Sequence, residues 1–145
     1  MKNLRAGTHY PGVCVVFICH DGMGRVLLHR RSAMCRDEHH LWASGAGQLE
    51  LHEGFEAAVR RGVKEKYCCQ ALRIDYASTA NVLRKHEGVR SHWVAIVFAV
   101  LVDPTKVRIG EPDKMDALDW FLSQAFPEHL HSKFAQHYNS VKHLL

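Results

Sequence analysis

Apolar and polar residues alternate along the first part of the chain in runs that predict strands and turns. Residues 12–19 (GVCVVFIC) form an apolar, β-branched run that is typical of a buried strand. The Asp-Gly pair at residues 21–22 and the nearby Gly24 predict a turn, because glycine adopts positive φ at little cost. Residues 25–31 then complete a predicted hairpin, and the polar residues 32–40 are expected to form a loop.

The second half of the chain carries the strongest strand signal. Residues 91–103 contain an apolar run of ten residues, from Trp93 to Val102, that is too short to cross a membrane as a helix. Weaker runs at residues 72–83 and 117–122 also predict strands. A turn is expected at Glu87-Gly88, and a loop at residues 111–113.

Two segments have helical spacing instead. Four apolar residues recur every fourth position in residues 55–67, and a similar apolar face spans residues 130–145. Strands therefore dominate, with two helices at separated positions. This order predicts one α+β domain over residues 1–145, of the mixed α/β sandwich type.

Composition narrows the class of protein. Apolar residues make up 47% of the 145 residues, which is enough for a core. The net charge of +4 would attract a polyphosphate, but no long Lys/Arg block predicts dedicated nucleic-acid binding. Five cysteines and a polar segment at residues 1–10 favour a reduced, cytoplasmic chain. The twelve histidines lack paired zinc-site spacing, so most are expected at the surface.

The segment with the clearest chemistry is residues 45–69, GAGQLELHEGFEAAVRRGVKEKYCC. Gly45 and Gly47 let the backbone turn tightly and approach a ligand closely. Glu50 and Glu53 precede the predicted helix, and Glu53 lies near its N-terminus, where negative charge is favoured. No Gly-Lys-Ser/Thr follows the glycines, and Glu50 stands at the third glycine position of a dinucleotide fingerprint, so neither of those phosphate loops fits.

One helical face is expected to carry positions 62, 65 and 66, which are separated by three and four residues. A metal-binding helix would place carboxylates on this face. The chain has Gly62, Glu65 and Lys66 there, and Arg61 lies four residues before Glu65, at a spacing that allows an ion pair.

This segment resembles the box of the Nudix family of diphosphate hydrolases: Gly, five residues, Glu, seven residues, Arg-Glu, an aliphatic, any residue, Glu-Glu, any residue, Gly. The frame has no insertion or deletion, and the matching residues are Gly47, Glu53, Arg61, Val63 and Glu65. The hairpin before the box and the segments at residues 91–94 and 111–121 are also similar to those of nucleotide-hydrolysing members. The resemblance covers nearly the whole chain, and it implies an α/β/α sandwich with a mixed sheet between the box helix and a C-terminal helix.

The resemblance also implies a reaction and a set of site residues. Water would attack a phosphoanhydride of a nucleoside diphosphate-linked substrate with the help of Mg²⁺ or Mn²⁺. The small-molecule partner would be a nucleotide or another diphosphate, and a homodimer is compatible with the family. The implied catalytic residues are Glu53, Glu65 and Arg61, with Glu65 and Glu50 as metal ligands. The implied substrate-binding residues are Gly47, Arg30, Lys66, Trp93 and Glu111, although the apolar neighbours of Trp93 also favour core packing.

The box departs from the family pattern at two positions that normally carry glutamate. Gly62 and Lys66 replace these residues, and the local charge changes by +3. Two unit charges ~4 Å apart interact by roughly 4 kcal/mol at an effective dielectric near 20, so Lys66 would repel a divalent ion on that order. Three functions remain open: a weakened hydrolase with one metal, a silent binder in which Lys66 contacts phosphate, and a protein-interaction or structural module.

Overall fold

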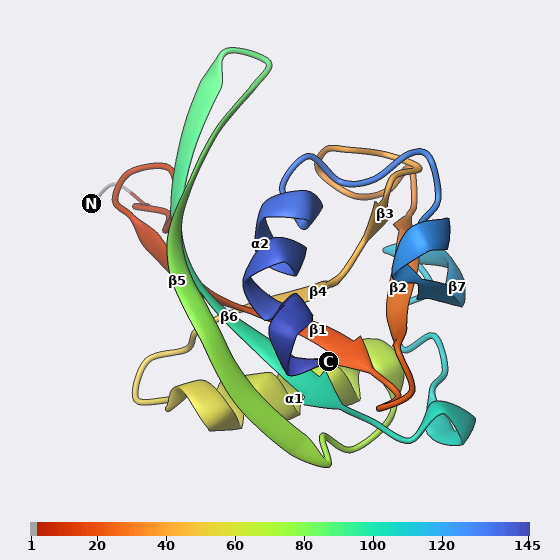
Figure 1. Cartoon of the computed structure of the whole chain (residues 1–145). Coiled ribbons are helices and arrows are strands. Elements are labelled where there is room, and N and C mark those ends of the chain that lie inside the picture. The colour runs from red at the N-terminus through yellow and green to blue at the C-terminus, as the bar shows by residue number, and fades with distance from the viewer. Residues whose placement is uncertain (1–2) are drawn as a thin grey trace.

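Seven strands in one mixed sheet and two α-helices on its opposite faces make up the fold of residues 3–145, which the computed structural model describes (Figure 1). The strands are β1 (Gly12–His20), β2 (Arg25–Arg31), β3 (Trp42–Ala43), β4 (Gly45–Gln48), β5 (Arg73–His86), β6 (Val89–Leu101) and β7 (Met115–Leu122). The helices are α1 (Phe55–Tyr67) and α2 (Phe134–Val141), with 3₁₀ turns at Pro104–Lys106, Ser123–Ala125 and Lys142–Leu144. Within residues 3–145, no helix has the length and apolar character that crossing a bilayer requires.

The two strongest predicted strands lie side by side in the centre of the sheet. Its order is β3-β2-β1-β6-β5, while β4 pairs with β1 and β7 pairs with β2. β1 and β6 run parallel, in register from Gly12↔Trp93 to His20↔Leu101. The other strand pairs are antiparallel. The box segment therefore reaches the sheet through β4, directly against β1.

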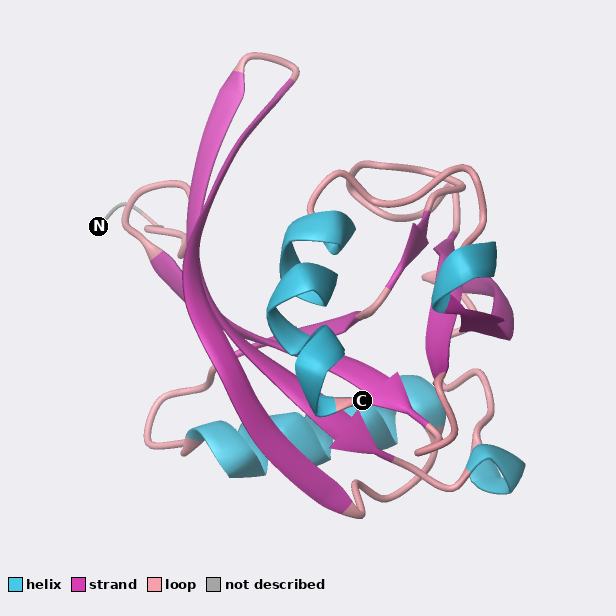
Figure 2. Cartoon of the chain, viewed as in Figure 1, coloured by secondary structure: helices cyan, strands magenta, loops and turns pink. Residues whose placement is uncertain are grey.

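Side chains of β1 alternate between the two cores of the sandwich, because successive residues of a strand face opposite sides of the sheet. Val15 and Phe17 pack with α1, whereas Val16 and Ile18 belong to the core that α2 covers. Both sets are buried. The α/β/α sandwich expected from the sequence is thus confirmed, with the helices on either side of the sheet (Figure 2).

Helix α1 begins and ends at the residues predicted from its spacing. Gly54 is its N-cap, and Cys68 follows it in the left-handed conformation, with φ 59°, while the Cys68 N–H donates to the Lys64 carbonyl. Left-handed backbone is common just after a helix and is easiest for glycine. Cys68 stands where the family pattern has its closing glycine, and it adopts the conformation that favours glycine there.

The predicted C-terminal helix is too long by several residues at its start. The chain forms α2 only from Phe134, and Leu130 makes an isolated bridge with Trp42. The Trp42 N–H donates to the His129 carbonyl at 2.8 Å, and the His131 N–H donates to the Trp42 carbonyl at 2.8 Å. These bonds to a distant strand hold residues 129–131 extended, so tertiary pairing overrides their helical spacing.

Beyond the sheet, β5 and β6 continue as a two-stranded ribbon that projects from the body of the molecule (Figure 1). The ribbon closes at Glu87 and Gly88, both with positive φ, where the sequence predicted a turn. Residues 7–11 of the N-terminal segment lie beside this ribbon, and a hollow opens between them.

Candidate active site

A bidentate ion pair ties the loop before α1 to the helix. Arg61 donates through Nε to Glu53 Oε2 at 2.7 Å and through Nη2 to Glu53 Oε1 at 2.9 Å. Arg61 Nη2 also donates to the Gln48 carbonyl at 2.9 Å. The hydrogen bonds from Arg61, and then that from the Glu50 N–H, lower the pKa of Glu53 to about 2. Glu53 is therefore an ionised carboxylate with both oxygens already engaged.

The other two glutamates proposed as metal ligands lie near the surface. Glu65 is about half exposed and contacts Arg61 through an Oε2–Nη1 distance of 3.4 Å. Glu50 is exposed, and within residues 3–145 its carboxylate makes no hydrogen bond or ion pair, although its N–H donates to Glu53 Oε1 at 3.0 Å. Arg61 thus contacts both Glu53 and Glu65, while the Glu50 carboxylate stays apart from them.

Gly62 faces the buried core, whereas the Glu65 side chain on the same helix is about half exposed. A Cβ on residue 62 would lie 2.6 Å from Cε1 of Phe17, closer than real side chains approach. Gly45 abuts the same ring from β4, and Phe17 itself is completely buried. The aromatic ring thus fills the space where a side chain at position 62 would begin.

Lys66 forms an ion pair with Glu111 in the loop that packs on the end of α1. The Nζ–Oε1 distance is 2.7 Å, and both side chains are mostly shielded, at 17% and 22% exposure. The Gly110 N–H donates to the Lys66 carbonyl at 2.8 Å, which holds the loop against the helix. The ammonium of Lys66 is thus already neutralised by a neighbour from 45 residues along the chain.

The same lysine influences a buried histidine beside the box helix. His29 Nδ1 lies 2.7 Å from the Tyr67 hydroxyl, and both residues are buried. Burial first, and then the charge of Lys66, lower the pKa of His29 to about 3. His29 is therefore neutral at physiological pH. It is also buried, whereas most of the histidines were expected at the surface.

These residues do not fit a divalent metal ion. Hard cations such as Mg²⁺ take several oxygen ligands. Here Phe17 closes off position 62, Lys66 stands in place of a carboxylate and occupies Glu111, and Glu53 is committed to Arg61. Among residues 3–145, no three His, Cys, Asp or Glu side chains gather closely enough to hold a metal.

A cavity of about 270 Å³ opens on the other face of the sheet, beneath α2. We call it the ligand cavity. Gly47 and Gln48 line one edge, and since the Gln48 carbonyl accepts from Arg61, the cavity adjoins the box loop. The rest of its lining combines apolar residues of the sheet with basic side chains. The apolar ones are Cys14, Val16, Ala46, Val82, Trp93 and Ala95, and the basic or histidine side chains are Arg31, Arg84, His131, Lys133 and His137.

A buried carboxylate positions two of these basic side chains. Asp37 is only 3% exposed and forms ion pairs with Arg31, Arg36 and Arg84. Burial raises the pKa of Asp37, but the three guanidiniums outweigh it and lower the pKa below its usual range. Arg84 also pairs with Glu38 at 3.0 Å. The guanidiniums of the cavity are thus fixed in place by the loop that follows β2.

His137 lines the ligand cavity and, within residues 3–145, has a buried ring nitrogen without a hydrogen-bond partner. Its side chain is 7% exposed, and Nδ1 is buried without a hydrogen-bond partner in the described part of the chain. Burial, and then the nearby Lys133, lower the pKa of His137, so the ring is uncharged. A buried polar atom without a partner is costly to the stability of the fold.

The residues expected from the sequence occupy two separate places. Glu53, Arg61, Glu65, Lys66 and Glu111 gather around α1, whereas Gly47 and Trp93 line the ligand cavity. The structure does not bring Arg30 to either group, because it pairs with Asp116 at 2.7 Å on β2 and β7.

Its neighbour Arg31 lines the cavity, because a β-bulge between Arg30 and Arg31 interrupts the alternation of β2. Alternation from Val26 and Leu28, which belong to the core beneath α2, favours Arg30 for the cavity, and no sequence pattern marks the bulge that brings Arg31 there instead. Sequence reasoning also missed four further lining residues, for which no local motif exists: Arg84, His131, Lys133 and His137.

Comparison with known proteins gives a consistent result. A family model described as the NUDIX domain matches residues 8–144. A MutT NUDIX hydrolase from Burkholderia pseudomallei is similar in structure, with a TM-score of 0.79, 26% identity, and coverage of 90% of this chain and 98% of the other. The MutT protein of Methanosarcina mazei Go1 has a TM-score of 0.74 and 21% identity, covering 92% and 95%.

A third similar structure is the NUDIX domain of Shewanella oneidensis NrtR, complexed with ADP ribose. Its TM-score is 0.72 at 18% identity, over 92% of this chain and 88% of that one. At such identity the likeness concerns the fold. No curated protein sequence matches the chain.

Proposed function

Because the chain belongs to the NUDIX family, we propose that it binds a nucleoside diphosphate-linked small molecule without cleaving the diphosphate. The observation that carries the proposal is the pairing of Lys66 with Glu111 at 2.7 Å. The family generally uses divalent metal ions, and Lys66 puts a fixed ammonium where its box has a glutamate. The ring of Phe17 at Gly62 supports the same conclusion, because it excludes a carboxylate from the second altered position.

The chemistry of the ligand cavity supports an anionic nucleotide as its occupant. Binding sites for small molecules combine an apolar body with a few placed polar groups. Trp93 and Val82 offer apolar surface, while Lys133 offers positive charge for phosphates beside the guanidiniums of Arg31 and Arg84, which Asp37 holds. The similar NrtR domain from Shewanella oneidensis was solved with ADP ribose, a molecule with a diphosphate at its centre.

The test is calorimetric titration of the chain with ADP ribose in the presence of EDTA. We expect binding without metal, and Lys133→Met should weaken it by about tenfold through the loss of a charge-assisted contact. Lys142→Met is the matched control, because Lys142 is exposed and outside the cavity lining, and its affinity should not change. Failure of every nucleotide to bind would favour an interaction module instead.

The competing function is slow, metal-assisted hydrolysis by the remaining carboxylates, Glu50, Glu53 and Glu65. Incubation of ADP ribose with the chain and Mg²⁺ or Mn²⁺, followed by ³¹P NMR, separates the two. We expect the diphosphate signal to persist. Metal-dependent cleavage that Glu65→Gln abolishes would overturn the binding proposal and establish a weak hydrolase.

We also infer a reducing, cytoplasmic setting for this activity. All five cysteines are free thiols, and Cys19 and Cys69 are buried in the core. A homodimer remains an expectation drawn from the family, and sedimentation velocity of the purified chain would measure it.

A further inference from the structure

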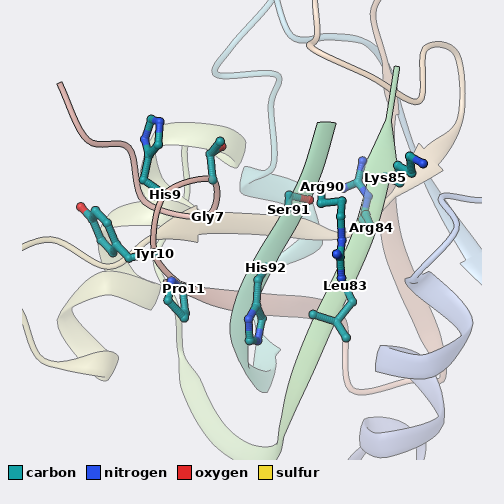
Figure 3. A pocket seen from close by; sticks show the side chains of 11 residues that line it. Gly7, His9, Tyr10, Pro11, Leu83, Arg84, Lys85, Arg90, Ser91 and His92 are labelled. Carbon is teal, nitrogen blue, oxygen red and sulfur yellow. The ribbon is translucent and has the colours of Figure 1, made fainter. Parts of the chain in front are cut away.

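A second, larger hollow of about 600 Å³ lies between the N-terminal segment and the β5–β6 ribbon, and we call it the hairpin groove (Figure 3). It is lined by residues 7–11, 83–85 and 90–92. Figure 3 shows these side chains coming from the N-terminal loop and from the two strands of the ribbon. The lining contains no carboxylate, although it includes several basic side chains.

The wall formed by the N-terminal loop is held in place by specific contacts. The Gly7 N–H donates to the Tyr10 carbonyl at 2.7 Å, and the His92 N–H donates to the Gly7 carbonyl at 2.8 Å. Gly7 and Gly12 both pack directly on the indole of Trp93, where neither position has room for a Cβ. The groove is thus a built feature between tethered segments.

The ribbon places two basic residues opposite each other on its strands, and both line this groove. Lys85 and Arg90 are register partners on β5 and β6, and neither side chain forms an ion pair within residues 3–145. Like charges directly opposite on antiparallel strands are destabilising. The adjacent Arg84 does not relieve them, because it is itself a cation engaged by Asp37 and Glu38.

An unfavourable pair of like charges that no nearby carboxylate among the described residues offsets is the kind of feature expected at functional sites. We propose that the hairpin groove binds a phosphate-bearing ligand, with the phosphate between Lys85 and Arg90. A phosphate would satisfy both cations and remove their mutual repulsion. Tyr10, Pro11 and Leu83 supply exposed apolar surface for the remainder of the ligand. The volume lies within the roughly 300–1,000 Å³ of small-molecule sites. This site is distinct from the ligand cavity.

Amide NMR during titration with ADP tests the proposal. Shifts at Gly7, Lys85 and His92 report on the hairpin groove, whereas shifts at Ala46 and Gly47 report on the ligand cavity. We expect both groups to move, with separate affinities. Movement of Ala46 and Gly47 alone, in titrations with ADP and with a single-stranded hexanucleotide, would overturn this inference and leave the proposed function intact.

Lys85→Glu separates a binding role from a structural one. The change should create a cross-strand ion pair with Arg90, which raises Tm by about 2 °C, while phosphate affinity at Gly7 and His92 falls at least tenfold. Lys106→Glu makes the same charge change at an exposed position outside the groove and should leave that affinity unchanged. Equal affinity for the native chain and Lys85→Glu would overturn the proposal.

The hexanucleotide distinguishes the source of the phosphate. Binding of ADP in the groove would assign it to a free nucleotide, and binding of the hexanucleotide alone would assign it to a phosphodiester chain. Both results support a phosphate site at Lys85 and Arg90, provided that Lys85→Glu abolishes the shifts.

Discussion

The ring of Phe17 fills the space beside Gly62, so that a Cβ on residue 62 would lie 2.6 Å from its Cε1 atom. The glycine in the box helix and the aromatic residue on β1 therefore form one packing unit. Loss of the family's glutamate at this position is coupled to a core contact, and restoring a carboxylate there requires a change on β1 as well.

Gly62→Ala is expected to destabilise the chain by up to about 2 kcal/mol. Alanine would gain about 1 kcal/mol over glycine in an exposed helix interior, but crowding of a packed core costs roughly 1–3 kcal/mol. Urea unfolding measures the difference. In a Phe17→Leu background the same change should be neutral or stabilising, and higher stability of Gly62→Ala in the native background would contradict the packing argument.

Lys66→Glu should give the chain a metal site that it lacks. The substitution places a second carboxylate beside that of Glu111 and removes the ammonium, so Mn²⁺ at millimolar concentration should raise Tm of the variant by about 3 °C or more. The native chain, and Lys64→Glu on an exposed position of the same helix, should show no such rise. A similar shift in the native chain would show that other residues bind the metal.

Stability should fall in acid because of His29. Its pKa is about 3 in the folded chain, against about 6.5 when unfolded, since burial and the charge of Lys66 disfavour the protonated ring. Between these values the unfolded chain binds a proton that the folded chain does not. Stability is therefore full above pH ~6.5 and declines by roughly 1.4 kcal/mol per unit as pH falls towards 3.

Urea unfolding from pH 7 to pH 4 measures this slope. His29→Gln should flatten it by about one proton, whereas His143→Gln, at an exposed position, should leave it unchanged. An unchanged slope in His29→Gln would assign the acid sensitivity to other groups, such as His131 and His137, whose pKa values burial also lowers.

His137→Phe should move stability and ligand affinity in opposite directions. The change removes a buried nitrogen without a partner, so the chain should keep its stability or gain up to about 1 kcal/mol. Affinity for ADP ribose should fall about tenfold, because the ligand loses a hydrogen-bond partner. Calorimetry and urea unfolding, with exposed His143→Phe as the control, measure both. Unchanged affinity would remove His137 from the binding site.

Local sequence patterns predicted the helices and strands well where contacts between residues close in sequence determine the structure. Helix α1 spans Phe55–Tyr67 as predicted, because its apolar stripe packs on a single core. β5 runs three residues beyond the predicted end at residue 83, since cross-strand bonds with β6 stabilise polar residues that have weak strand patterns of their own. The organisation of residues 1–145 as one domain stays a prediction, and residues 1–2 lie outside the described residues.

The site depended on contacts between distant residues, which spacing does not reveal. Asp37 sits in a loop predicted to be polar, yet it is buried because Arg84, 47 residues away, reaches it. The sequence shows Lys66 as a charge that would repel a metal ion. Its ion pair with Glu111 is visible only in the structure. The box motif located the helix and the residues Glu53 and Arg61. It carried no information about α2, from which His137 lines the ligand cavity.

The indole of Trp93 lies between the ligand cavity and the segment that lines the hairpin groove. Trp93 lines the ligand cavity, while Gly7 and Gly12 of the segment that walls the hairpin groove press on the same ring. Evolution can exchange the polar residues of either compartment independently, but positions 7 and 12 must stay free of side chains while tryptophan remains at 93. Laboratory selection for a new ligand should therefore tolerate changes at Lys133 far more readily than at Gly12.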